Sequence, residues 1–208
     1  LHRVDRRQRQ MCIRDRRYGL PGLAEDVDSG RWIEADVKTP QGYTVTVVCV
    51  YVHAGNTDDP EKMKQKYRFL DTMLVRMGQL RDEAAHGGKQ AVLCGDFNIA
   101  HTPLDIKNAK ANEKHAGFLP EERAYVDKWL GELEFVDVMR SLCGDIQGPY
   151  TWWSQRGRAF DNNVGWRIDY QFATPELAET ARGFVIDKAP TYDLRWSDHA
   201  PLSITYDV

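Results

Sequence analysis

The chain has 208 residues, of which 42% are hydrophobic and 11% aromatic, so it can bury a substantial core and is expected to form one main domain. Its formal net charge of -3 excludes a global basic field for nucleic acid, and any groove that binds a polyanion must be local. No apolar run is long enough to span a bilayer and no signal peptide is visible, which predicts a cytoplasmic protein.

The four cysteines show no paired spacing typical of a zinc site, and two of them lie inside apolar, strand-like runs. This pattern favours reduced thiols over a disulfide framework. The cysteines are Cys12, Cys49, Cys94 and Cys143.

The first 17 residues contain seven arginines and few apolar side chains, a composition that cannot offset the entropy of ordering by burial. They could be a nucleic-acid-binding arm or a targeting peptide. We favour a third interpretation, in which residues 1–17 are disordered or foreign to the domain and residues 18–208 form the domain.

Residues 31–37 alternate in polarity, and residues 44–52 are a β-branched run, which predicts a hairpin whose buried second strand ends near Tyr51. A helix is expected from Asp58 to about Leu80, because acids and a proline begin it and apolar residues recur at helical spacing. The charged segment 81–89 then returns the chain to a further strand, so strand, helix and strand form a crossover unit.

That further strand, residues 91–98, is an apolar run that ends in Gly95-Asp96-Phe97-Asn98. Strand geometry places Asp96 and Asn98 on one side and Phe97 on the other, in the core. The same residues also suit an ordinary strand-ending turn. Downstream, Lys107, Lys110 and Lys114 form either a local positive element or a solvated loop, and a helix is expected from Pro120.

Residues 150–170 predict two short aromatic strands around a loop rich in Arg, Asn and Gly, with Arg167 and Asp169 on one face of the second strand. Aromatics interleaved with arginine suit a surface that stacks sugars or bases and pairs with phosphate. For Trp153 and Trp166, a place in the core and a place in a site both remain open. Ser197-Asp198-His199 precedes a final alternating strand and, alone, indicates no more than a solvated turn.

Together, three motifs resemble the exonuclease III / apurinic-apyrimidinic endonuclease family of the endonuclease/exonuclease/phosphatase superfamily, from about Arg31 to Val208. The motifs are Gly95-Asp96-Phe97-Asn98 with His101 and Asp105, Gly165-Trp166-Arg167-Ile168-Asp169-Tyr170, and Ser197-Asp198-His199-Ala200-Pro201. The resemblance implies an α/β fold, a four-layer sandwich of two mixed β-sheets face to face with helices outside.

The resemblance also implies a DNA-repair nuclease, with 3′ to 5′ exonuclease activity on duplex DNA and cleavage 5′ of abasic sites. Asp96 would orient and deprotonate the attacking water, and Asn98 would hold the water or the phosphate. His199 would donate to a phosphate oxygen, Asp169 would fix the tautomer of His199, and Tyr51 would contact the phosphate.

The metal implied is Mg²⁺ or Mn²⁺, near Asp198, Asp96 and Asn98. The expected partner is double-stranded DNA with abasic sites or 3′ ends, bound by a chain that is a monomer when complete. The residues expected to shape the pocket for the abasic sugar are Trp152, Arg156, Asn163 and Trp166.

Members of this family carry principal metal ligands on a Trp-Asn strand and a Gln-Glu strand, and neither motif occurs here. We therefore expect an N-terminally truncated domain with exposed strand edges and poor activity. One alternative is a superfamily phosphodiesterase for a lipid head group, which the aromatic block at 152–170 disfavours. Another is a fragment that binds DNA through basic side chains without cutting it, namely Lys107, Lys110, Arg156 and Arg158.

Overall fold

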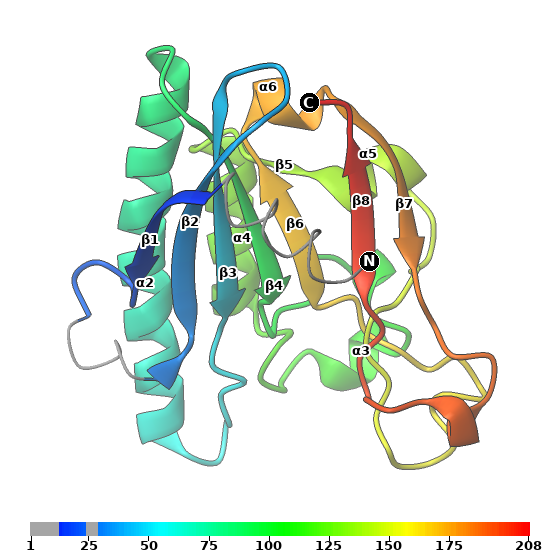
Figure 1. Ribbon diagram of the computed structural model, residues 1–208. Helices are drawn as coiled ribbons and strands as arrows, with labels where there is room; N and C mark the ends of the chain where they lie inside the picture. The colour runs from blue at the N-terminus through cyan, green and yellow to red at the C-terminus, as the bar shows by residue number, and fades with distance from the viewer. Residues whose placement is uncertain (1–12, 24–28) are drawn as a thin grey trace.

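The computed structural model describes residues 13–23 and 29–208 (Figure 1). A six-stranded mixed sheet has the strand order β1-β2-β3-β4-β6-β5, and β7 and β8 form a separate antiparallel pair. The strands are β1 (Ile13–Tyr18), β2 (Trp32–Lys38), β3 (Thr44–Tyr51), β4 (Gln90–Asp96), β5 (Val136–Asp137), β6 (Asp169–Ala173), β7 (Ala181–Ile186) and β8 (Leu202–Tyr206). The helices are α2 (Pro60–Ala85), α3 (Ala109–Asn112), α4 (Pro120–Gly131), α5 (Val138–Cys143) and α6 (Pro175–Ala178), with short 3-10 turns η2 (Pro103–Asp105) and η3 (Tyr192–Leu194).

The predicted hairpin and crossover are both confirmed. β2 and β3 pair antiparallel from Trp32↔Val50 to Lys38↔Thr44, and β3 and β4 pair in parallel with α2 between them. Helix α2 begins where expected, because the Asp59 side chain accepts a hydrogen bond from the Lys62 amide. It ends at Ala85 rather than near Leu80, so half of the predicted charged connection is helical.

The two faces of the large sheet carry different layers (Figure 1). Helix α2 runs along one face (Figure 1). The main hydrophobic core contains residues of α2 and of the sheet together with Trp129 of α4, and it also includes Phe97 and Phe172. The Phe97 and Phe172 ring centroids are 4.9 Å apart, so Phe97 packs in the core as expected. The β7–β8 pair lies over the other face, where Ile204 of β8 packs near Ala173 of β6.

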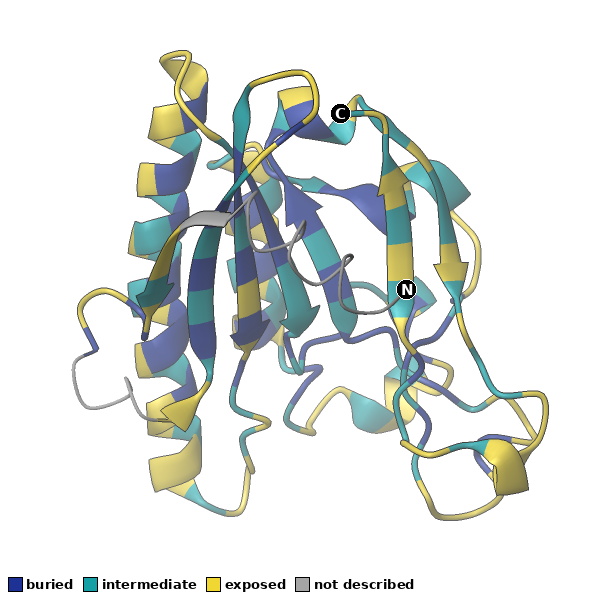
Figure 2. Ribbon diagram, in the orientation of Figure 1, coloured by how far each residue is buried: buried dark blue, intermediate teal, exposed yellow. Residues whose placement is uncertain are grey.

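The α/β class with two sheets and flanking helices is therefore confirmed. Among the described residues the second sheet has two antiparallel strands, instead of the mixed sheet expected. In Figure 2 the ribbon positions coloured as buried form bands across β2, β3, β4 and β6, which marks the large sheet as the centre of the core.

Residues 13–17 of the segment that was expected to lie outside the domain form most of β1 and pair with β2. Arg17 lies 2.9 Å from Oε2 of Glu34 and 3.0 Å from Oδ1 of Asp36, and both carboxylates are buried. Buried acids on β2 require a cation, and Arg17 supplies one from the neighbouring strand. Residues 1–12 of the expected foreign segment lie outside the described residues.

The prediction of two short strands in residues 150–170 is half right. The first strand does not form, because Trp152 makes only isolated bridges, whereas the second is β6, which begins at Asp169. Residues 136–137 form the short strand β5, and α5 begins at Val138.

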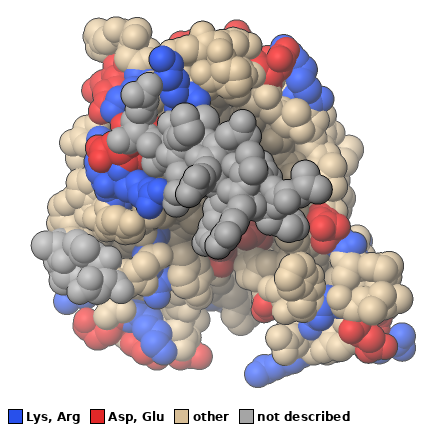
Figure 3. All heavy atoms as spheres, viewed as in Figure 1, with Lys and Arg blue, Asp and Glu red and all other residues tan. Residues whose placement is uncertain are grey.

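The described surface agrees with the small net charge. On the face shown in Figure 3, basic and acidic side chains are interspersed. None of the helices in the described part of the chain has both the length and the apolar composition needed to cross a bilayer.

Candidate active site

Three expected site residues occupy neighbouring strand ends. Tyr51 of β3 pairs with Asp96 of β4, and Asp96 pairs with Asp169 of β6, so the three residues form one rung across the sheet. The strands approach closely here, since a Cβ at Gly95 would lie 1.9 Å from the Val50 carbonyl oxygen. Only glycine fits that position, and its φ of 143° also disfavours any other residue.

The turn after β4 fixes the Asp96 carboxylate. Asn98 adopts a φ of 49°, which lets its amide N–H donate to Oδ1 of Asp96 at 2.8 Å and its Nδ2 donate to Oδ2 at 3.0 Å. Nδ2 also donates to the Val52 carbonyl at 2.9 Å. Burial, followed by the charge of Asp169, raises the pKa of Asp96 to about 6. A carboxylate with this pKa is a suitable proton acceptor near neutral pH.

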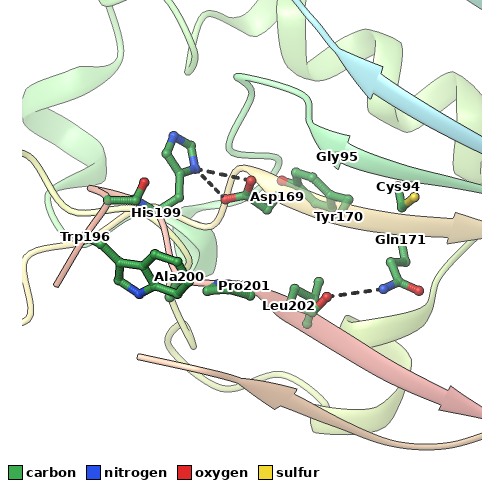
Figure 4. Close-up of a pocket in the computed structure, with 11 residues that line it drawn as sticks. Cys94, Gly95, Asp169, Tyr170, Gln171, Trp196, His199, Ala200, Pro201 and Leu202 are labelled. Carbon is green, nitrogen blue, oxygen red and sulfur yellow. Dashed lines mark hydrogen bonds and ion pairs between the residues drawn. The ribbon is translucent and has the colours of Figure 1, made fainter. Parts of the chain in front are cut away.

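His199 lies between two carboxylates. Its Nδ1 is 3.0 Å from Oδ2 of Asp169, and its Nε2 is 3.8 Å from Oδ2 of Asp96. Figure 4 shows the ring directed at Asp169. Burial lowers the pKa of His199, but the hydrogen bond and charge of Asp169, with the charges of Asp96 and Asp198, outweigh it and raise that pKa overall.

Hydrogen bonds join the segments that carry these groups. The buried Thr151 hydroxyl accepts from the amides of Ile168 and Asp169, at 3.2 and 3.1 Å. Trp152 Nε1 donates to Oδ2 of Asp198 at 2.9 Å. The strand ends, the 151–153 segment and the 197–200 segment therefore hold one another in place.

These groups border a pocket of about 420 Å³. Trp152 and Trp166 form one wall as a perpendicular ring pair, with centroids 6.0 Å apart. Trp153 is instead only 2% exposed. Of the two places that the sequence left open, Trp153 therefore lies in the core and Trp166 lies at the pocket. The expected site residues that line the pocket are Tyr51, Asp96, Asn98, Trp152, Trp166, Asp198 and His199.

Two expected substrate-binding residues do not line this pocket. Asn163 Oδ1 accepts from Trp153 Nε1 at 3.0 Å, so its side chain supports a core tryptophan. Arg156 is exposed in the neighbouring turn. Contact of either with substrate remains a prediction.

Arg167, which the sequence placed on one face with Asp169, is fully buried among carboxylates. Its Nε lies 2.7 Å from Oδ1 of Asp105, and its Nη1 lies 2.7 Å from Oδ2 of Asp137. Arg140 also pairs with Asp105. A guanidinium neutralised in this way supports the fold beneath the pocket and is not free to bind an anion.

Sequence reasoning missed a buried ion pair behind the pocket. Lys66 Nζ lies 2.5 Å from Oε1 of Glu122, and both side chains are inaccessible to solvent. The same Nζ donates to the carbonyls of Asn98 at 2.9 Å and Ala54 at 3.1 Å. Glu122 accepts from the amide of Gly117, which lines the pocket. The available signal was a lysine at a core-facing position of the α2 apolar stripe.

The carboxylates at the pocket do not complete a cation site. Within residues 13–23 and 29–208, no group of three or more His, Cys, Asp and Glu side chains is arranged to hold a metal ion. Asp96 accepts from Asn98, and Asp198 accepts from Trp152. The expected ligands Asp198, Asp96 and Asn98 thus meet at one pocket, but as arranged they do not fit a metal ion.

His199 also lines a second pocket, of about 340 Å³ (Figure 4). It extends from Trp196, which is 96% exposed, past Asp169 to Cys94 on β4. His199 is common to the linings of the two pockets.

Comparisons with known proteins agree on one family. A sequence model described as the endonuclease/exonuclease/phosphatase family matches residues 28–199. The exodeoxyribonuclease of Bacillus subtilis is 41% identical over 191 residues, which are 92% of this chain and 69% of that protein. A DNA-(apurinic or apyrimidinic site) endonuclease of Dictyostelium discoideum is 36% identical over 191 residues, and this chain spans 49% of it.

Solved structures are similar as well. An AP endonuclease from Archaeoglobus fulgidus matches with a TM-score of 0.80 and 32% identity, covering 94% of this chain and 72% of that one. A 3'-5' exonuclease from Neisseria meningitidis matches with a TM-score of 0.80 and 30% identity, at the same coverage. A 3' phosphatase from Neisseria, bound to a product DNA hairpin, matches with a TM-score of 0.81 and 29% identity, again at that coverage.

Proposed function

Because this chain belongs to the endonuclease/exonuclease/phosphatase family, we propose that it is a DNA-repair nuclease that hydrolyses phosphodiester bonds at the pocket between Asp96, His199 and Trp166. The observation that carries the proposal is the His199 imidazole between Asp169 and Asp96, at the rim of an aromatic pocket. A base, a cationic donor and a stacking wall within one pocket suit an anionic, sugar-containing substrate.

Each residue has a chemical role in this proposal. Asp96 orients the attacking water and accepts its proton as a P–O bond forms and another breaks, and Asn98 holds the carboxylate or the phosphate. His199, whose protonated form is favoured by the hydrogen bond and charge of Asp169, donates a hydrogen bond to a phosphate oxygen. Tyr51, 47% exposed at the pocket rim, contacts the phosphate.

Nucleases of this superfamily depend on a divalent metal ion, and we propose Mg²⁺ or Mn²⁺ for this protein. Such an ion would neutralise charge on the phosphate. Because the described carboxylates do not complete a cation site, no step of the mechanism is assigned to it.

The proposed substrate is duplex DNA with an abasic site or a 3′ end. Trp152 and Trp166 offer an aromatic surface to a sugar that lacks its base, and extruding such a sugar costs less than extruding a paired nucleotide. The names of the B. subtilis and D. discoideum relatives support both activities. A cytoplasmic location and a monomeric state remain predictions.

Incubation of the chain with a duplex carrying one abasic analogue tests this function. With Mg²⁺ we expect incision 5′ of the analogue, slow because the described residues complete no cation site, and none with a chelator. A duplex of the same sequence without the analogue is the control. Incision in the presence of the chelator, or equal incision of the duplex without the analogue, contradicts the proposal.

The incomplete cation site favours one second candidate, a protein that binds DNA without cutting it. The side chains of Lys107, Lys110, Arg156 and Arg158 are exposed and could contact backbone phosphates. Duplex binding that weakens steeply with salt, without incision at any Mg²⁺ concentration, would support this candidate instead of the nuclease.

A further inference from the structure

Cys49 and Cys94 face each other on neighbouring strands, two residues before Tyr51 and Asp96. They are a register pair in the parallel ladder of β3 and β4. Because paired residues of neighbouring strands place their side chains on the same face, the two thiols project from one side of the sheet. Neighbouring strands lie about 4.8 Å apart. This separation is within the range of about 4.4–6.8 Å that Cα atoms span in disulfides.

The Cys94 thiol is directed at the strand that carries Cys49. Cys94 Sγ donates to the Val48 carbonyl at 3.2 Å, so the sulfur leans toward β3. The neighbouring Cys94 side chain lowers the pKa of Cys49 to about 6, although partial burial opposes this shift. Both cysteines are free thiols in the structure.

An oxidant can reach this pair. Cys49 is exposed, while Cys94 is half-buried and lines the pocket that opens between Trp196 and β4 (Figure 4). An exposed thiol beside a less accessible partner is the arrangement of an attacking and a resolving cysteine. Cys143 differs, because its sulfur lies near Arg140 on α5 and no other cysteine is its strand partner.

We propose that Cys49 and Cys94 form a reversible dithiol–disulfide site that small hydroperoxides oxidise. The Cys49 thiolate attacks one oxygen of hydrogen peroxide, so an S–O bond forms, the O–O bond breaks and one water leaves after protonation. The Cys94 sulfur then attacks Cys49, the S–O bond breaks and a second water carries away the Cys94 proton. Two thiols lose two electrons to the peroxide, and one disulfide forms.

A disulfide between directly paired residues of adjacent strands is constrained by the ladder, so we expect reducing thiols to open it readily. This inference does not depend on the nuclease proposal, because it concerns the cysteine pair and needs no substrate.

The test oxidises the reduced, full-length chain with hydrogen peroxide in a Cys12→Ser background, which leaves three thiols. We expect the loss of two thiols per chain, a peptide linking Cys49 to Cys94, and recovery of both thiols with dithiothreitol. Cys143→Ser is the matched control and should form the same link. Cys94→Ser should stop at the Cys49 sulfenic acid, detected as a dimedone adduct.

Three results would overturn the site. One is that Cys49 oxidises to the sulfinic acid although Cys94 is present, and that no peptide linking Cys49 to Cys94 is found. Another is a disulfide that joins two chains. The last is loss of thiols at Cys143 while Cys49 and Cys94 stay reduced.

Discussion

Nδ1 of His199 lies 3.0 Å from a carboxylate oxygen of Asp169, and this contact brings a residue of the 197–200 segment against the start of β6. The two residues are 30 positions apart in the sequence. The contact decides which ring nitrogen faces the pocket, since Nδ1 is engaged and Nε2 points toward Asp96.

Replacing Asp169 with Asn should lower the pKa of His199. Removing the carboxylate takes away the hydrogen bond and charge that raise this pKa, while the opposing burial remains. An NMR titration of the His199 ring protons measures the change. Asp127→Asn, beside His101, is the matched control and should leave the His199 titration unchanged. An unaltered His199 pKa in Asp169→Asn would show that the contact does not control its charge.

Replacing Asp96 with Asn should stabilise the fold at neutral pH. The native pKa of Asp96, about 6, exceeds its ordinary value of 3.8, so this group favours the folded state below pH 3.8, and that contribution is lost as the pH rises through about 6. An amide has no such dependence. The free energy of unfolding should therefore favour Asp96→Asn by about 1–3 kcal/mol more at pH 7.5 than at pH 4.

Urea unfolding of both proteins in the presence of a chelator measures this difference. A stability difference that is the same at pH 4 and pH 7.5 would contradict the raised pKa. If Asp96→Asn gained less stability at pH 7.5 than at pH 4, folding would lower the pKa of Asp96 instead of raising it.

The Lys66–Glu122 pair should hold the loops that line the pocket. Lys66→Met leaves a buried, uncompensated carboxylate and should cost about 3–5 kcal/mol. Adding Glu122→Gln removes that charge and should restore much of the stability. It should not restore incision, because the bonds from Lys66 to the Asn98 and Ala54 carbonyls stay absent.

Urea unfolding and incision rate are measured on the single and double variants. Recovery of both properties in the double variant would mean that the ion pair supports only stability. Lys66→Arg retains the charge and serves as the conservative comparison.

Substitutions of Trp153 and Trp166 should have different effects, the first mainly on the stability of the fold and the second mainly on DNA binding. Trp153→Ala opens a cavity in the core and should destabilise the fold by about 3–5 kcal/mol. Trp166→Ala should cost less stability but weaken binding of the abasic duplex, because the side chain lines the pocket. Urea unfolding and fluorescence anisotropy with a labelled duplex measure the two effects. Equal losses of binding in the two variants would contradict the distinction.

The local patterns of the sequence predicted the strand ends that carry Tyr51 and Asp96. Phe97 packs in the core as expected, whereas Asn98 meets Asp96 through a turn of positive φ after β4, which is the alternative that the sequence also allowed. The pairing of Tyr51 with Asp96 follows from the crossover, since parallel strands end at the same edge of a sheet.

The features that sequence reasoning missed depend on contacts between distant segments. Arg17 belongs to the fold because buried carboxylates on β2 need a cation, which its arginine-rich surroundings do not reveal. Arg167 is buried because Asp105 and Asp137 neutralise it from other segments. The alternation around Trp152 and Trp166 suggests strands, but these residues bridge at isolated points and close a pocket.

Phosphodiester hydrolysis at the Asp96 pocket is the activity proposed for this protein. The most direct measurement is the single-turnover rate of incision of an abasic duplex with Mg²⁺, for the unmodified chain, Asp96→Asn and a control, Asp82→Asn, on the exposed side of α2. We predict measurable incision by the unmodified chain. The rate should fall by a factor of about 10² or more in Asp96→Asn and stay unchanged in Asp82→Asn. Equal rates in all three proteins, or no incision by the unmodified chain at any Mg²⁺ concentration, would contradict the claim.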